Sequence, residues 1–202
     1  MKILLVLQSK NISGISYYRQ LMPHAYLSSV YKDVEIEQIQ GSTYENIFAL
    51  PDEKLKEFQI AVLSREIDGK GTGLQTINRL RSLGIKVVLD IDDYWVLPSH
   101  HPLKKVYEYF NIPDKIIENI KAADYVVCTN KMLAHYISDY TDKVMVLPNC
   151  VDKNQPQMQV IPVASDVMRF GWIGGVYHTK DIEPLERSFT KLLTDKSIKD
   201  KW

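Results

Sequence analysis

Short apolar segments rich in β-branched residues alternate along this chain with stretches of helical periodicity. Successive apolar segments are about 25 to 30 residues apart, close to the length of one strand–helix unit. Continuous apolar runs of this kind are typical of strands buried on both faces of a sheet. Strands of this kind are predicted over residues 3–7, 60–63, 85–91, 125–128 and 144–147, and the alternation of apolar and polar residues over 34–39 predicts a half-exposed strand. Because these segments alternate with helices, the sequence predicts βαβ units with right-handed crossovers and a doubly wound, mostly parallel α/β sheet.

The helical segments are recognised by their apolar spacing and by their end signals. The clearest runs from Leu74 to Leu83, with an isoleucine or leucine every three residues, and Gly84 follows as a C-terminal stop. Further helices are predicted over residues 15–30, 112–123 and 132–137.

The texture of the sequence changes after residue 147. Residues 148–152 are rich in turn formers, and residues 153–162 contain three glutamines and two prolines with little periodicity. A strand over residues 168–173 and a helix over residues 181–193 are then predicted. The sequence thus predicts an N-terminal domain over residues 1–150, a linker over 151–166, and the start of a second α/β domain over 167–202. One strand and one helix cannot bury both faces of the strand, so we expect the chain to stop inside its second domain.

Charge and cysteine content exclude several classes of protein. The 25 basic and 25 acidic residues cancel, and no basic stripe is visible, so no nucleic-acid partner is expected. The two cysteines, Cys128 and Cys150, have no partner at metal-ligand spacing, and Cys128 lies in an apolar run that predicts burial. No segment approaches the roughly 18 apolar residues of a membrane span, and the N-terminal apolar run is too short for a signal peptide. A cytoplasmic protein is expected.

Carboxylates and aromatic rings gather at the end of the predicted strand over residues 85–91. They are Asp90, Asp92, Asp93, Tyr94, Trp95 and His100. In open α/β sheets, ligands bind in the crevice outside the carboxyl ends of the strands, so these carboxylates are expected to face that crevice. Metal binding, general base catalysis and recognition of sugar hydroxyls are the functional interpretations, and capping of the next turn is the structural one. The rings of Tyr94, Trp95 and His100 would line a sugar-binding site or pack in the core.

The Asp90-x-Asp92 pattern matches two known motifs in part. It resembles the aspartyl-phosphate motif of haloacid-dehalogenase-like phosphatases, but Tyr94 stands where that motif has threonine or valine. It also resembles the manganese site of GT-A glycosyltransferases, although three residues make a weak signal. A hydrolase that uses Asp90 and Asp92 therefore remains an alternative.

Two loops have the composition of anion sites. Ser13 and Gly14 follow the first strand and open a helix, whose N-terminus favours anions, but there is no G-x-G-x-x-G fingerprint. In the second loop, backbone amides and a lysine charge would suit a diphosphate. That loop contains Gly174, Gly175, His178 and Lys180. A plain turn glycine and solvated charges are the structural alternatives.

Four features, in order, resemble a GT-B glycosyltransferase of the group 1 (family 4) type. The first is a strand, the Ser13–Gly14 loop and a helix that carries Tyr17, Tyr18 and Arg19; the second is the strand ending in Asp90 to Asp93. The third and most specific consists of residues 123–129 (ADYVVCT) and 143–152 (KVMVLPNCVD), which resemble the passage that ends the family's N-terminal domain. The fourth is the strand and glycine turn of residues 170–181.

The resemblance implies two Rossmann-like domains and a transferase without a required metal or other cofactor. The N-terminal domain would bind a glycan or lipid-linked acceptor, and the C-terminal domain would bind the nucleotide-sugar that donates a hexose, with retention. In polysaccharide biosynthesis such an enzyme works in the cytoplasm, and peripheral contact with the inner face of the membrane is compatible with it. The resemblance implies catalytic roles for Asp92 and Asp93. It implies substrate binding by Ser13, Gly14, Asp90, Tyr94, Trp95 and His100. Donor phosphate binding is implied for Gly174, Gly175, His178 and Lys180.

The sequence departs from the family pattern at several places. Aspartate stands where relatives often have histidine, and Cys150 replaces the usual glycine. The family's later acidic motif, which holds the donor, would lie beyond Trp202. The resemblance therefore implies that this stretch lacks a complete donor site and needs the remaining C-terminal half. A non-catalytic sugar- or nucleotide-binding α/β module is the alternative.

Overall fold

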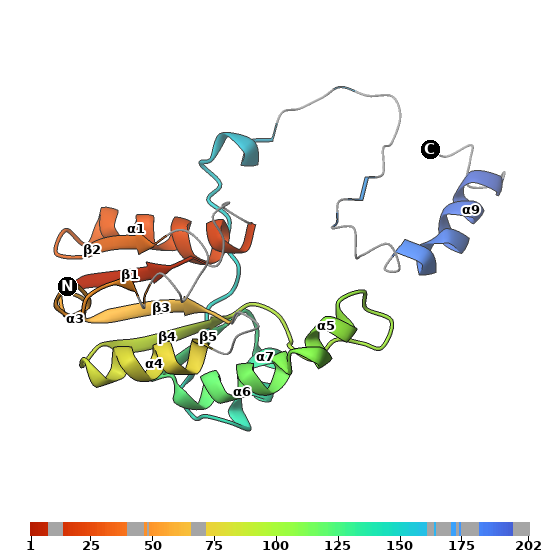
Figure 1. Ribbon diagram of the computed structural model, residues 1–202. Coiled ribbons are helices and arrows are strands. Elements are labelled where there is room, and N and C mark those ends of the chain that lie inside the picture. The colour runs from red at the N-terminus through yellow and green to blue at the C-terminus, as the bar shows by residue number, and fades with distance from the viewer. Residues whose placement is uncertain are drawn as a thin grey trace. The chain divides into compact units, whose positions relative to one another are not determined.

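The computed structural model describes residues 1–7, 14–39, 47, 49–65, 72–160, 164, 171–172, 174 and 182–195 (Figure 1). The chain divides into two compact units. One is formed by Met1–Ser99 and Leu103–Val151, and the other by His100–Pro102 and Asp152–Trp202. The domain boundaries at residues 150 and 166 stay a prediction from the sequence.

Within the described part of the first unit, six strands form one all-parallel sheet in the order β2-β1-β3-β4-β5-β6. The strands are β1 (Lys2–Val6), β2 (Glu35–Ile39), β3 (Ile60–Ser64), β4 (Lys86–Ile91), β5 (Tyr125–Cys128) and β6 (Val144–Val146). The predicted doubly wound parallel α/β sheet is thereby confirmed, and its topology is Rossmann-like. The strand order reverses at β1, because β2 pairs on one side of it and β3 on the other.

Helices cover both faces of this sheet (Figure 1). They are η1 (Ser16–Leu21), α1 (Met22–Val30), α3 (Asp52–Leu55), α4 (Thr72–Ser82), α5 (Lys104–Tyr109), α6 (Ile112–Ala122) and α7 (Lys131–Ser138). Alternate residues of a strand point to opposite faces, and the core is divided accordingly. Leu4 and Val6 join a large cluster with α4, α6 and α7, while Ile3 and Leu5 join a smaller one against η1 and α1.

Most predicted helices of the first unit are confirmed, with shifted ends. The helix expected from Leu74 to Leu83 is α4, and the stop residue Gly84 has a φ of +82°, a left-handed conformation that favours glycine. The helices expected over residues 112–123 and 132–137 are α6 and α7. Two short helices, α3 and α5, were not predicted, because neither is long enough to show a periodic apolar stripe.

A proline shapes the helix that follows β1. Pro23 has no N–H to donate, and its ring would clash with the carbonyl of Arg19 in a regular α-helix. The turn before it is instead the π-helix η1, in which the Met22 N–H donates to Tyr17 O. The wider turn accommodates the proline. It also directs Ser16, Arg19 and Gln20 toward the interior, where all three are buried.

The described part of the second unit is small. It contains the 3₁₀ turns η2 (Pro156–Met158) and η4 (Glu183–Leu185) and the helix α9 (Glu186–Thr194), so the helix predicted over residues 181–193 is confirmed. The strand predicted over residues 168–173 lies largely outside the described residues. Across all the described ranges, no helix combines the length and apolar character that crossing a bilayer would require.

Candidate functional site

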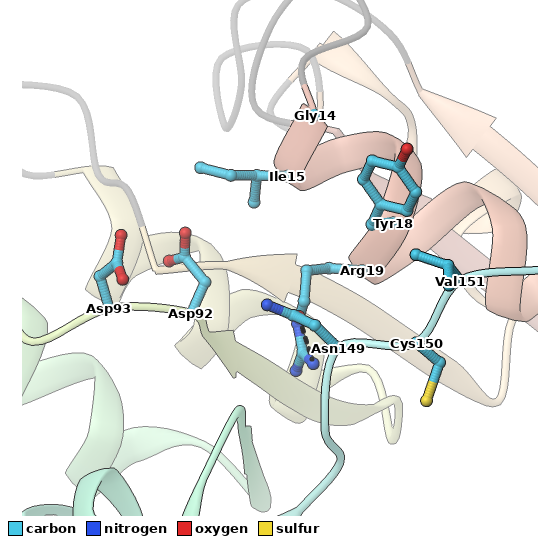
Figure 2. A pocket seen from close by; sticks show the side chains of 9 residues that line it. All are labelled: Gly14, Ile15, Tyr18, Arg19, Asp92, Asp93, Asn149, Cys150 and Val151. Carbon is cyan, nitrogen blue, oxygen red and sulfur yellow. Dashed lines mark hydrogen bonds between the residues drawn. The ribbon is translucent and has the colours of Figure 1, made fainter. Parts of the chain in front are cut away.

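A cleft of about 320 Å³ opens at the carboxyl ends of the strands in the first unit (Figure 2). Three segments line it: the start of the helix after β1, the end of β4, and the segment after β6. The lining residues are Gly14, Ile15, Tyr18, Arg19, Asp92, Asp93, Asn149, Cys150 and Val151. The helix start follows β1, the strand at which the order reverses, and this is where doubly wound sheets bind ligands.

Arg19 of η1, which lines the cleft, forms a buried ion pair with Asp90 of β4. The Arg19 Nη2 donates to Asp90 Oδ1 at 2.5 Å, and Nε donates to Oδ2 at 3.2 Å. The two side chains are only 3% and 7% exposed. This two-pronged geometry is the strongest form of arginine–carboxylate contact, and it fixes both side chains.

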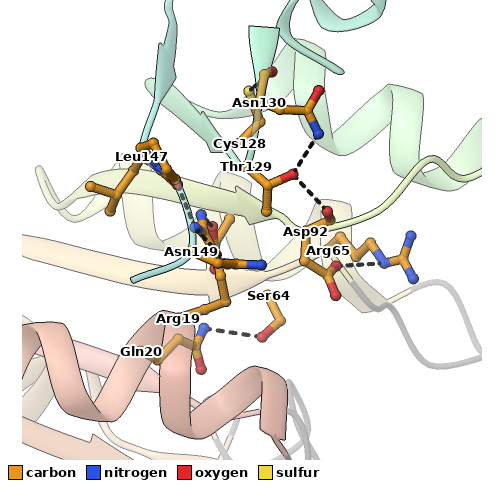
Figure 3. A network of polar contacts seen from close by, with 12 residues as sticks. Arg19, Gln20, Ser64, Arg65, Asp92, Cys128, Thr129, Asn130, Leu147 and Asn149 are labelled. Atoms are coloured by element: carbon orange, nitrogen blue, oxygen red, sulfur yellow. Dashed lines mark hydrogen bonds and ion pairs between the residues drawn. The ribbon is translucent and has the colours of Figure 1, made fainter. Parts of the chain in front are cut away.

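The same guanidinium holds the segment after β6. Its Nη1 donates to Leu147 O at 2.5 Å and to Asn149 Oδ1 at 3.3 Å (Figure 3). Arg19 therefore connects three parts of the chain that are distant in sequence: η1, β4 and the cleft wall at Asn149 to Val151. Its role in the site is to position that wall.

Two opposing effects act on the Asp90 carboxyl. Burial raises its pKa above the usual value, and the hydrogen bonds and charge of Arg19 oppose that shift. Both Asp90 oxygens accept hydrogen bonds from the permanently charged guanidinium, which is the geometry of a carboxylate–guanidinium pair. With both oxygens bonded to Arg19, Asp90 is a structural carboxylate and is absent from the cleft lining.

Arg65, just after β3, fixes the turn that carries the next two aspartates. Its Nε lies 3.1 Å from Asp92 Oδ1, and its Nη1 donates to Asp93 O at 2.8 Å. From the other side, the Thr129 hydroxyl donates to Asp92 O at 3.0 Å (Figure 3). The backbone at Asp92 is thus tied to the ends of the two neighbouring strands, β3 and β5.

Asp93 differs from Asp92 in that its carboxylate has no partner among the described residues. The Asp93 side chain points toward the cleft (Figure 2), and no described residue forms a hydrogen bond or ion pair with its oxygens. Asp92 and Asp93 together present carboxylate oxygens that can accept hydrogen bonds from hydroxyl or ammonium groups.

The other predicted site residues of the first unit are distributed unequally. Gly14 lines the cleft, whereas Tyr94 and Trp95 do not. Tyr94 is 43% exposed, and its ring centroid lies 4.8 Å from that of Tyr136. Trp95 is 2% exposed and belongs to the large core cluster, so its structural role is packing.

The remaining predicted site residues lie in the second unit or outside the residues that the structure describes. His100 is exposed and belongs to the second unit, as does Gly174, which lies beside the ring of Trp172. Ser13, Gly175, His178 and Lys180 lie outside the described residues, so their predicted roles stay predictions. In the described ranges, no group of three or more histidine, cysteine, aspartate or glutamate side chains could hold a metal ion.

Sequence reasoning assigned no role to Arg19, Arg65 or Asn149. Arg19 is an arginine on the inward face of an apolar helix, and that placement signals a buried ion pair. Its partner Asp90 is 71 positions away, so the pairing follows only from the sheet topology. Arg65 directly follows β3 and Asn149 comes shortly after β6, and polar residues beyond strand ends reach the crevice.

The two cysteines provide a chemical reporter for the cleft. Cys150 is exposed and lines it. Cys128 is 0% exposed, as its apolar surroundings predicted, and burial raises the pKa of its thiol. Because the thiolate is the reactive form, an alkylating reagent is expected to modify Cys150 and spare Cys128 in the folded protein.

Comparison with models of known protein families, with curated proteins and with solved structures found no match to this chain. The chemistry of the site therefore has to be argued from its own residues. The cleft offers carboxylates, an amide and a phenol to a ligand, and these are groups that recognise hydroxyls.

Proposed function

We propose that the first unit binds a sugar in this cleft and is the acceptor-side domain of a glycosyltransferase. The enzyme would move a hexose from a nucleotide-sugar to a glycan or lipid-linked acceptor. The observation that carries the proposal is the projection of Asp92 and Asp93 into an open cleft at the reversal point of a parallel sheet. Adjacent carboxylates can accept hydrogen bonds from neighbouring hydroxyls of one sugar ring.

In this proposal Asp92 and Asp93 have different tasks. Asp92, held by Arg65, would fix one hydroxyl in a defined place, and Asp93, whose carboxylate has no described partner, would hold a second one. Holding the acceptor in line with the donor supplies much of the rate by proximity and orientation. In the transfer, the anomeric carbon exchanges its bond to the diphosphate for a bond to an acceptor oxygen. The hydroxyl proton leaves with the diphosphate.

The two substrates together would determine where the enzyme works in the cell. A nucleotide-sugar donor would place the enzyme in the cytoplasm, and a lipid-linked acceptor would bring it to the inner face of the membrane. The donor diphosphate would contact the loop with Gly174, Gly175, His178 and Lys180.

A non-catalytic sugar-binding module is the second candidate. It is favoured by the fact that every residue lining the cleft belongs to the first unit. The phosphatase alternative is less compatible with the geometry. Its nucleophile would be Asp90, whose two oxygens are both bonded to Arg19.

Sugar binding is tested by protection of Cys150 in the 202-residue chain. The rate of Cys150 alkylation by iodoacetamide is followed by mass spectrometry, with Cys128 as the internal reference. A methyl hexoside is expected to slow the reaction in a saturable way. Asp92→Asn should weaken this protection, and Asp142→Asn, at an exposed aspartate outside the cleft, should not. If no methyl hexoside protects Cys150 at any concentration, the proposal is wrong.

A further inference from the structure

We infer that the cleft selects its sugar by charge, binding an amine-bearing sugar best, a neutral sugar less well and an acidic sugar worst. The inference rests on the sugar-binding function proposed above and specifies its substrate class. It follows from the balance of charges that the described lining residues present to a ligand.

The arginine of the lining has no charge to spare for an anion. A guanidinium has five N–H donors. Four of those of Arg19 are used in contacts with the two oxygens of Asp90, with Leu147 O and with Asn149 Oδ1. Its positive charge is neutralised by Asp90 at hydrogen-bond distance, with both side chains almost fully buried. A carboxylate or phosphate on the ligand would therefore find no free cation at this position.

The two carboxylates of the lining are not compensated equally. Asp92 shares its charge with Arg65, at 3.1 Å from Nε. The Arg65 Nη1 also donates hydrogen bonds to the backbone carbonyls of Asp93 and Tyr94. These bonds do not involve the Asp93 carboxylate. With Arg19 paired to Asp90 and Arg65 to Asp92, the described lining is left with one unbalanced negative charge, on Asp93.

The helix start at Gly14 contributes the opposite sign but a smaller magnitude. A helix N-terminus is equivalent to about half a positive charge, whereas the Asp93 carboxylate is a full negative charge. The net charge that the described lining presents to a ligand is therefore negative. An ammonium group on the sugar gains from it, and a carboxylate or phosphate group loses.

The size of the preference follows from the exposure of Asp93. Single ion pairs at exposed positions change affinity by up to about fivefold. An amine-bearing and an acidic sugar differ by an attraction and a repulsion, so we expect their affinities to differ by about tenfold. Salt screens interactions between exposed charges, so high ionic strength should reduce this difference.

The experiment compares three probes of matched shape in the Cys150 protection assay: methyl glucosaminide, methyl glucoside and methyl glucuronide. In the unmodified chain, the concentration giving half protection should rise in that order. Asp93→Asn should bring the three values together, and added salt should narrow the differences in the unmodified chain. Asp142→Asn serves as the matched control and should keep the order.

The outcomes separate the two proposals. Protection by the neutral glycoside, with equal or better protection by the glucuronide, overturns the charge selection and leaves sugar binding in place. Charge selection that persists unchanged in Asp93→Asn overturns the assignment to Asp93. Absence of protection by all three glycosides overturns sugar binding itself, and the inference with it.

Discussion

Arg19 and Asp90 form a bidentate ion pair across 71 positions of the sequence, with their side chains 3% and 7% exposed. The pair links the π-helix after β1 to the end of β4. Because the guanidinium also bonds Leu147 and Asn149, the cleft wall after β6 depends on the same side chain. Stability and the shape of the cleft are thus coupled through Arg19.

Removing this arginine should destabilise the fold strongly. Arg19→Met leaves the Asp90 carboxylate buried without a partner, a change that typically costs about 3–5 kcal/mol. Urea unfolding of the first unit measures the loss. Arg81→Met is the matched control, since the Arg81 side chain is 45% exposed and its pair with Asp124 should be worth at most about 1 kcal/mol. Equal urea midpoints for the two variants would contradict the structural role of Arg19.

Replacing both members of the buried pair should recover most of the lost stability. In Arg19→Met/Asp90→Leu no uncompensated charge remains, and apolar replacements of buried pairs are often neutral or stabilising. The double variant should nevertheless alter the reactivity of Cys150, because the wall after β6 has lost its contacts with Arg19. Urea midpoints and alkylation rates of the same sample test both statements.

The stability of the first unit should depend on pH through the protonation of His24. Burial lowers the pKa of its imidazole below the usual 6.5, although the hydrogen bond between Nδ1 and Gln20 O opposes the shift. The unfolded chain therefore binds a proton before the folded one does, as the pH falls. The His24 contribution is complete above 6.5 and is lost as the pH drops toward the folded-state pKa, by at most about 1.4 kcal/mol per pH unit.

The free energy of unfolding at several pH values, for the unmodified chain and for His24→Gln, isolates this effect. The difference between the two should change between pH 7 and pH 5. His135→Gln, at an exposed position, supplies the control. Parallel stability curves for the unmodified chain and His24→Gln would exclude a titration of His24.

Asn119 is a site where an apolar substitution should stabilise the protein. The side chain is 0% exposed, and neither its amide nitrogen nor its oxygen has a hydrogen-bond partner in the described structure. Asn119→Leu replaces the unsatisfied buried amide with an apolar side chain of the same branched shape, and it should add about 1–2 kcal/mol to the free energy of unfolding. Asn130→Leu should have the opposite effect, because Asn130 accepts a hydrogen bond from Leu133 N and caps α7. A lower urea midpoint for Asn119→Leu would show that the amide is satisfied in solution.

The thiols offer a simple check on the position of the segment after β6. The folded chain should react with an aromatic disulfide at Cys150 alone, and addition of urea should expose Cys128 as a second reactive thiol. Rapid reaction of both thiols without urea would mean that β5 is not buried as described.

The sheet was predictable because each strand carries its own signal. Residues 3–7, for example, form an uninterrupted apolar run, which suits a strand covered on both sides, and residues 85–91 are mostly apolar as well. The placement of Asp92 and Asp93 at the cleft followed from the same logic, since it needed only the strand end and the rule on parallel sheets.

The contacts that complete the cleft could not be predicted from the sequence, because they join residues that are far apart in the chain. Nothing near Arg19 in the sequence points to Asp90, and the wide π-turn that directs Arg19 inward is a response to Pro23, four residues later. Trp95 illustrates a different limit. An aromatic residue after a strand suits a sugar wall and a core equally well, and only the three-dimensional packing places it in the core.

The all-parallel pairing of β1 has a consequence for synthesis on the ribosome. Ile3 pairs with Ile36 and Ile60, so β1 is translated before either of its partner strands. Until those strands are made, Leu4, Leu5 and Leu7, which are at most 1% exposed in the folded chain, have nothing to pack against. A parallel sheet of this topology folds slowly, and β1 is prone to aggregate while it is unpaired. We therefore expect the yield of folded protein to rise with slower translation and with chaperones that shield nascent apolar segments.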